Sequence, residues 1–83
     1  MLKEVTRFDN RMIERVSKTM ARKAFNNGKY VYFVPQKCGL HGMFTSCINK
    51  KDCDDSFDSI YNSYAFYNLG GELGQTVKCY AEQ

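Results

Sequence analysis

An aromatic-rich stretch at residues 56–74 limits the folds open to this chain more than any other segment. Five of the eleven residues from Phe57 to Tyr67 are aromatic. Ser56 and the acidic residues before it favour a helix start, because short polar and acidic side chains satisfy the free N–H groups there. The positions on one side of such a helix are Phe57, Ile60, Tyr61, Tyr64 and Asn68. The sequence therefore predicts a helix that begins at about Phe57 and is closed by the glycines from Gly70 onward.

The first interpretation of this helix is a core helix with a broad apolar face. The second is that its tyrosines form a binding surface, since a tyrosine ring buries well while its hydroxyl group needs water or a partner. A face this wide is difficult to bury completely on one helix. We therefore expect some of Tyr61, Tyr64 and Tyr67 to be at least partly exposed, and these three are the candidate contacts to a protein partner, which could be a second copy of the chain.

The size of the chain, 83 residues, predicts a single small domain over residues 1–83, with residues 1–9 as a flexible lead-in. A domain of this size buries roughly 60–65% of its unfolded surface, so its core is small. No apolar run approaches the length of a membrane span, and the N-terminal residues lack the apolar segment of a signal peptide. We expect a cytoplasmic protein with reduced thiols, no contact with a membrane and no cofactor.

The first half of the chain contains a strand, a helix and a second strand. Residues 11–16 fit a strand, and Ser17 is a good N-cap for a helix over residues 18–27. The Asn-Asn-Gly sequence that follows is a strong stop signal. The apolar run at residues 30–34 predicts a central strand. One long N-terminal helix from Asp9 is the alternative, which would give the order α-β-β-α-β.

The second half adds a strand at residues 43–48, a polar connection, the aromatic helix and a last strand at residues 76–81. The predicted order is β-α-β-β-α-β. We expect an α+β fold with a small, single-layer, mostly antiparallel sheet and two helices on one of its faces. This order is compatible with a ferredoxin-like or split βαβ arrangement but does not fix the order of the strands in the sheet.

Charge is distributed unevenly along the chain. Residues 1–37 carry nine Lys and Arg and three acids, a net charge of +6, whereas residues 38–83 carry three Lys and six acids, a net charge of −3. A basic half can pair with the acidic half or can offer a face to an anionic partner. Nucleic-acid binding is therefore the alternative function, with phosphate contacts from Arg11, Arg15, Lys18, Arg22 and Lys23. Aromatic side chains on an open sheet face, such as Tyr30, Tyr32 or Phe44, could stack on bases.

The cysteines and the single histidine give a weak zinc motif. The candidate ligands are Cys38, His41, Cys47 and Cys53. Their spacing is irregular, no CxxC pair is present, and Cys47 and Cys79 read more simply as small core residues. No orienting group for a Cys–His nucleophile pair is evident. We therefore expect no metal and no enzymatic activity.

Several of these segments together resemble a group of small uncharacterised proteins carried by bacterial phages, plasmids and other mobile elements. The matching pieces are Val16-Ser17, Ala21-Arg22-Lys23, Asn27-Gly28-Lys29, Tyr30 to Pro35, Phe57-Asp58-Ser59, Tyr64 to Asn68, Glu72-Leu73-Gly74 and Tyr80. The resemblance covers about residues 11–81 and favours a strand at residues 11–16. It implies an accessory role, such as modulation of a host system, and it implies no activity or catalytic residue. We therefore expect a non-enzymatic protein-interaction module.

Overall fold

A computed structural model describes residues 5–36, 39–42, 44–69 and 77–83, with residues 67–69 described as backbone. Its strands are β1 (Val5–Phe8), β2 (Arg11–Val16), β3 (Val31–Pro35), β4 (Ser46–Ile48) and β5 (Val77–Glu82). Its helices are α1 (Lys18–Asn26), the short 3-10 helix η1 (Lys50–Asp52) and α2 (Phe57–Leu69). The strands form one sheet in the order β1-β2-β5-β3-β4, and all neighbouring strands are antiparallel. The predicted α+β fold class is confirmed.

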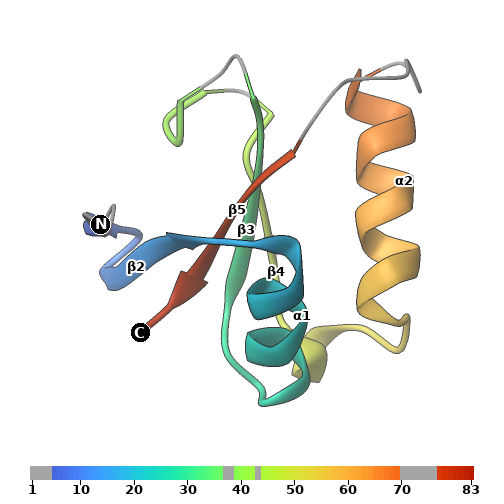
Figure 1. Ribbon diagram of the computed structural model, residues 1–83, viewed down its shortest axis with the longest axis horizontal. Coiled ribbons are helices and arrows are strands. Elements are labelled where there is room, and N and C mark those ends of the chain that lie inside the picture. Colours follow the sequence, from blue (N-terminus) through green and yellow to red (C-terminus); the bar gives the residue numbers. More distant parts are fainter. Residues whose placement is uncertain (1–4, 37–38, 43, 70–76) are drawn as a thin grey trace.

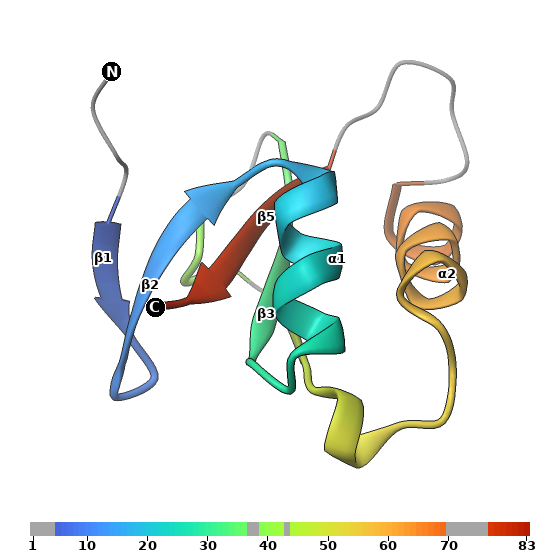
Figure 2. The same ribbon diagram turned by 60° about the horizontal axis from the view of Figure 1, so that its bottom comes forward.

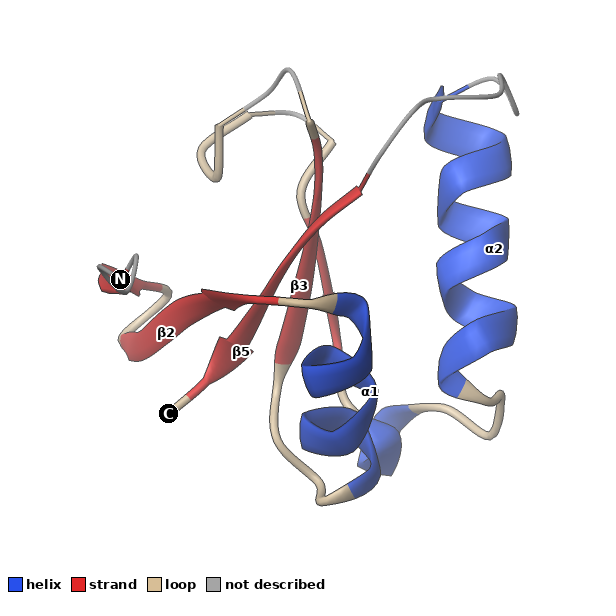
Figure 3. Cartoon of the chain, in the orientation of Figure 1, coloured by secondary structure: helices blue, strands red, loops and turns tan. Residues whose placement is uncertain are grey.

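The sheet contains two interlocking split βαβ units. Strands β2 and β3 are parallel to each other with β5 between them, and α1 connects them. Strands β4 and β5 are likewise parallel with β3 between them, and α2 lies in their connection. Both helices cover the same face of the sheet (Figure 1; Figure 3). This interlocking places β3 and β5 at the centre of the sheet and leaves β1 and β4 at its two ends.

Strand β1 corrects the expectation that residues 1–9 are a flexible lead-in. Val5–Phe8 pairs with β2 in an antiparallel hairpin, which lies at the end of the sheet away from α2 (Figure 2). Asp9 and Asn10 form its two-residue turn with φ angles of 56° and 63°. Asn and Asp tolerate this left-handed conformation better than most residues, and turns of this hand match the twist of a hairpin. The alternative of one long helix from Asp9 is wrong, because the chain reverses here and continues as β2.

The start of α1 follows the sequence prediction. The Ser17 side-chain oxygen accepts a hydrogen bond from the Met20 backbone N–H at 3.2 Å, as an N-cap residue does. The helix ends at Asn26, and Gly28 has a φ of 84°, a conformation that favours glycine. Ala21 and Phe25 are buried against the sheet, whereas Met20 is 52% exposed.

Apolar side chains are buried on both faces of the sheet. On the face with the helices, Phe33 lies at the centre of an aromatic group, with ring centroids 5.4–5.6 Å from those of Phe57, Tyr61 and Tyr64. On the helix-free face, the buried cluster is Ile13, Tyr32, Val34 and Tyr80. All five residues of β3 are buried, which confirms the prediction of a central strand that is apolar on both faces.

Strand β4 is shorter than predicted. The strand covers Ser46–Ile48, whereas the expected range was 43–48, and residue 43 lies outside the described residues. Phe44 is 48% exposed and precedes the strand. In β5 the described strand begins at Val77, and the predicted start at residue 76 lies outside the described part of the chain.

Candidate functional site

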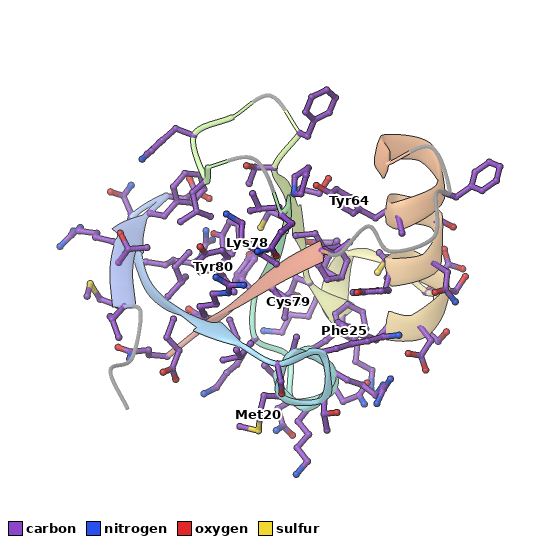
Figure 4. All side chains as sticks on the ribbon, turned by 45° about the horizontal axis from the view of Figure 1, so that its top comes forward. Met20, Phe25, Tyr64, Lys78, Cys79 and Tyr80 are labelled. Carbon is purple, nitrogen blue, oxygen red and sulfur yellow. The ribbon has the colours of Figure 1, made fainter. Side chains whose placement is uncertain are left out.

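The tyrosines of α2 pack inward more than the sequence suggested. Tyr64 is 6% exposed, points from α2 toward the strands (Figure 4), and donates a hydrogen bond from its hydroxyl group to the Phe44 carbonyl oxygen at 2.6 Å. Tyr61 is half-buried, and the Lys18 ammonium group lies 4.2 Å above its ring centre. The Tyr67 side chain lies outside the described residues. Tyr64 is therefore a core residue, and it is not one of the exposed tyrosines that the sequence predicted.

A groove of about 300 Å³ lies between β4 and α2. Its walls and floor are formed by Phe33, Ser46, Ile48, Asp55, Ile60, Ser63 and Tyr64. Apolar side chains from both elements form much of this surface, and hydroxyl groups of two serines add hydrogen-bonding capacity. The groove combines an apolar surface with a few polar groups, which is the usual composition of a binding site.

The position of α2 creates this groove. The aromatic residues of α2 pack on Phe33 in the neighbouring strand β3, so the helix stands to one side of the end strand (Figure 1). Among the described strands, β4 pairs with β3 alone. Because Ser46 lies opposite Phe33 and Ile48 lies opposite Val31, these two side chains share the helix-covered face and line the space below the helix. The last strand of the sheet therefore borders an open groove.

The connection from β4 to α2 is fixed by Asn49, which is 3% exposed. Its side-chain amide donates to the Gly28 carbonyl oxygen at 2.8 Å, and its side-chain oxygen accepts from the Lys51 backbone N–H at 2.9 Å. This residue ties the segment after β4 to the loop after α1. The sequence interpretation treated it as part of a polar connection, and its role was missed because a single Asn in a polar segment gives no sign of burial.

One end of the groove is acidic. Asp55 lines it, just before Ser56, whose side-chain oxygen accepts from the Ser59 backbone N–H at 3.2 Å and so caps the helix. Asp58 pairs with Arg22 of α1 through a contact of 2.7 Å between Oδ1 and Nη2. Within the part of the chain that the structure describes, Asp55 makes no ion pair of this kind. Its carboxylate is therefore available to a charged group in the groove.

The five basic residues expected to contact nucleic acid do not form one patch. Alternation along β2 places Arg11 and Arg15 on the helix-free face with Ile13. Arg22 and Lys18 of α1 lie on the opposite side of the sheet and contact α2, through Asp58 and Tyr61 respectively. Lys23 borders a separate cavity of about 230 Å³ between α1 and the sheet.

Arg11 is part of a polar network on the helix-free face. Its Nη1 atom lies 2.8 Å from the Asp9 Oδ2 atom and 2.9 Å from the Tyr32 hydroxyl oxygen. Its guanidinium group lies 3.7 Å above the ring centre of Tyr30. Burial raises the pKa of the Tyr32 phenol above its usual range. The network holds the β1–β2 turn against β3, so it has a structural role.

The three described cysteines differ in burial. Cys79 is buried in the core, as predicted, and burial raises the pKa of its thiol to about 11. Cys47 is exposed, which corrects the prediction of a core residue, and Cys53 is half-buried. Cys38 lies outside the described residues. Among the residues that are described, no three His, Cys, Asp or Glu side chains are grouped so that they could hold a metal ion.

His41 and Cys47 both line a cavity of about 410 Å³ on the helix-free face. The His41 ring lies against Phe8, with ring centres 5.2 Å apart. The described residues include no hydrogen bond between this imidazole and the Cys47 thiol, and desolvation of the partly covered sulfur beside Tyr32 raises the pKa of that thiol. A nucleophilic cysteine needs a lowered pKa, so this arrangement does not activate Cys47.

Comparisons with protein-family models, with curated proteins and with solved structures found no match to this chain. Among the described residues, no helix has the length and apolar character needed to cross a membrane.

Proposed function

We propose that this chain is a non-enzymatic protein-interaction module that binds a segment of a partner protein in the groove between β4 and α2. The observation that carries the proposal is the position of this groove beside an end strand of the sheet, with Ile48 and Ile60 as its accessible apolar surface. End strands flanked by a helix and a groove are a common way to bind peptide segments.

The dimensions of the groove favour a peptide over a bulky ligand. A volume of about 300 Å³ is at the small end of the range for ligand sites and holds a few side chains. The site also lies over a rigid base, because Phe33 at its floor is fully buried and packs on three aromatic rings of α2. A preformed surface lowers the entropy that a partner loses on binding.

Two earlier expectations remain predictions. An accessory role on a host system follows from the resemblance to proteins of mobile elements and would make the partner a host protein. Nucleic-acid binding through Arg11, Arg15 and the basic residues of α1 is the alternative function. The separation of these residues onto two sides of the sheet favours the protein-binding proposal, because a phosphate backbone contacts a continuous basic surface most effectively.

A display selection with random 12-residue peptides tests the proposal. The wild-type protein and two variants, Ser63→Arg and Asn62→Arg, serve as targets. Both residues are exposed positions in α2, but Ser63 lines the groove and Asn62 lies about 100° away around the helix and does not line it. We expect peptides that bind the wild type and Asn62→Arg and that lose at least ten-fold in affinity for Ser63→Arg.

Two outcomes would overturn the proposal. One is a selection without any peptide that distinguishes the Ser63 and Asn62 variants. The other is micromolar, salt-dependent binding of single-stranded RNA or duplex DNA in fluorescence anisotropy together with the absence of groove-dependent peptides, which would establish the nucleic-acid alternative.

A further inference from the structure

Resting on the function proposed above, we infer that the occupant of the groove is an extended peptide segment. The segment joins the sheet as a further strand beside β4, places an apolar side chain against Ile48 and Ile60, and carries a Lys or Arg side chain opposite Asp55. Three features support this inference: the open side of β4, the alternation of side chains along a strand, and the charge at one end of the groove.

The open side of β4 provides the main-chain contacts. Among the described strands, this strand is bonded to β3 on one side and to no strand on the other. An end strand presents a row of backbone N–H and C=O groups that another extended chain can bind. Ser46–Ile48 spans about 10 Å at 3.3 Å per residue, so the strand can pair with three to five residues of a partner.

Alternation of side chains then places the partner's residues. Side chains at every second position of an added strand lie on the helix-covered face, the same face as Ser46 and Ile48. There they meet the half-buried side chains of Ile48 and Ile60 and the hydroxyl group of Ser63. At one position this space accepts an aliphatic or aromatic side chain, because burial of apolar area is the main favourable contribution available in the groove.

The two ends of the groove differ in chemistry. Asp55 contributes a carboxylate without an ion-pair partner among the described residues, and Asp54 beside it adds negative charge to the approach. Tyr64, which also lines the groove, is held by its hydrogen bond to the Phe44 carbonyl oxygen and adds no charge. A cationic side chain two or more residues away from the apolar one in the bound segment is therefore complementary to this site.

Two measurements on the most enriched peptide from the selection test the inference. The first is a scan in which each peptide amide is N-methylated in turn, with the dissociation constant measured by isothermal titration calorimetry. N-methylation removes a donor, and in an added strand successive N–H groups point to opposite sides. We expect a ten-fold or larger loss at alternate positions along three to five residues and little change at the positions between them.

The second measurement compares Asp55→Lys with Asp54→Lys. Both substitutions change an exposed acid before α2 by the same charge, but only Asp55 lines the groove. We expect Asp55→Lys to weaken binding about five-fold, as for an exposed ion pair worth about 1 kcal/mol, and Asp54→Lys to weaken it less than two-fold. A peptide whose Lys or Arg is replaced by Glu should bind Asp55→Lys better than the wild type.

Failure of the inference can be told apart from failure of the proposed function. One outcome is that peptide binding depends on Ser63 but shows no alternation in the N-methyl scan, or does not change with the charge at position 55. This outcome would support the proposed function and overturn the inference. A dimer of the free protein in sedimentation equilibrium that is broken by Ser63→Arg and not by Asn62→Arg would identify a second copy as the occupant and would also overturn it.

Discussion

The hydroxyl group of Tyr64 donates a 2.6 Å hydrogen bond to the carbonyl oxygen of Phe44, which joins α2 to the segment before β4. The same ring lies 5.4 Å from that of Phe33, centre to centre. Tyr64 therefore performs two structural tasks, because its ring packs in the core while its hydroxyl group satisfies a backbone oxygen beside the groove. This contact ties the helix wall of the groove to the segment that leads into its strand wall.

We predict that Tyr64→Phe lowers the free energy of unfolding by about 1–2 kcal/mol, because the Phe44 carbonyl oxygen loses its partner. Tyr64→Ala should cost about 3–5 kcal/mol, as for other large-to-small changes of buried aromatic residues. Urea denaturation monitored by circular dichroism measures both. A loss below about 1 kcal/mol for Tyr64→Ala, which an exposed tyrosine would give, would contradict the core position.

The sequence predicted most of the fold because its signals are local. Ser17 caps α1, the apolar run forms β3, and the helix at Phe57 begins where short polar side chains precede an aromatic stretch. Strand β1 was missed, although Asp9-Asn10 between two alternating segments is a hairpin signal. Residues 5–8 are a short and partly polar segment. A strand there can be recognised only from its pairing with β2.

The groove could not be predicted, because it depends on contacts between distant segments. The pattern on α2 showed a broad apolar face, but which tyrosine points inward depends on where Phe33 lies in the assembled sheet. The order β2-β5-β3-β4 likewise decides that β4 is an end strand. The five basic residues lie close together along the sequence. The change from strand to helix at Ser17 nevertheless places those of β2 and those of α1 on different faces of the sheet.

The turn between β1 and β2 provides a second prediction. Asn10 has a φ of 63°, a conformation that glycine adopts without strain and that a β-branched residue adopts at a cost. Asn10→Gly should leave the free energy of unfolding unchanged or raise it by up to about 1 kcal/mol, whereas Asn10→Val should lower it by about 1–2 kcal/mol. Equal effects of the two substitutions in thermal denaturation would exclude the left-handed turn.

The pairing of α1 with α2 gives a third prediction. Arg22 and Asp58 form a 2.7 Å contact, with side chains 38% and 55% exposed. Water and salt screen such a pair, so a double-mutant cycle with Arg22→Ala and Asp58→Ala should give a coupling of about 0.2–1 kcal/mol that falls as the salt concentration rises. A coupling that does not change between low and high salt would show that the interaction is not electrostatic.

The buried thiol of Cys79 predicts a loss of stability at high pH. Burial raises its pKa from 9.0 to about 11, so the unfolded chain releases this proton at a lower pH than the folded chain. The contribution to stability is therefore complete below pH 9 and is lost as the pH rises to about 11. Over this window the free energy of unfolding should fall by up to about 2–3 kcal/mol on account of this group.

The variant Cys79→Ala isolates that contribution, because its other titrating groups are those of the wild type. We expect the free energy of unfolding to fall less steeply between pH 9 and pH 11 in the variant. Parallel pH profiles for the two proteins would show that the thiol ionises equally in both states.

Thiol reactivity gives the last prediction and tests the placement of the cysteines directly. Cys47 is exposed, Cys53 is half-buried and Cys79 is 3% exposed. Three variants that carry Cys38→Ser each keep a single cysteine, because the other two are also replaced. Their rates of reaction with a disulfide reagent should fall in the order Cys47, Cys53, Cys79. Cys79 should react only through unfolding, because access to a buried thiol requires the core to open.

The same variants in 6 M guanidinium chloride serve as the control, where all three should react at similar rates. A Cys79 that reacts as fast as Cys47 in the folded protein would refute the packing of β5 beneath the two helices.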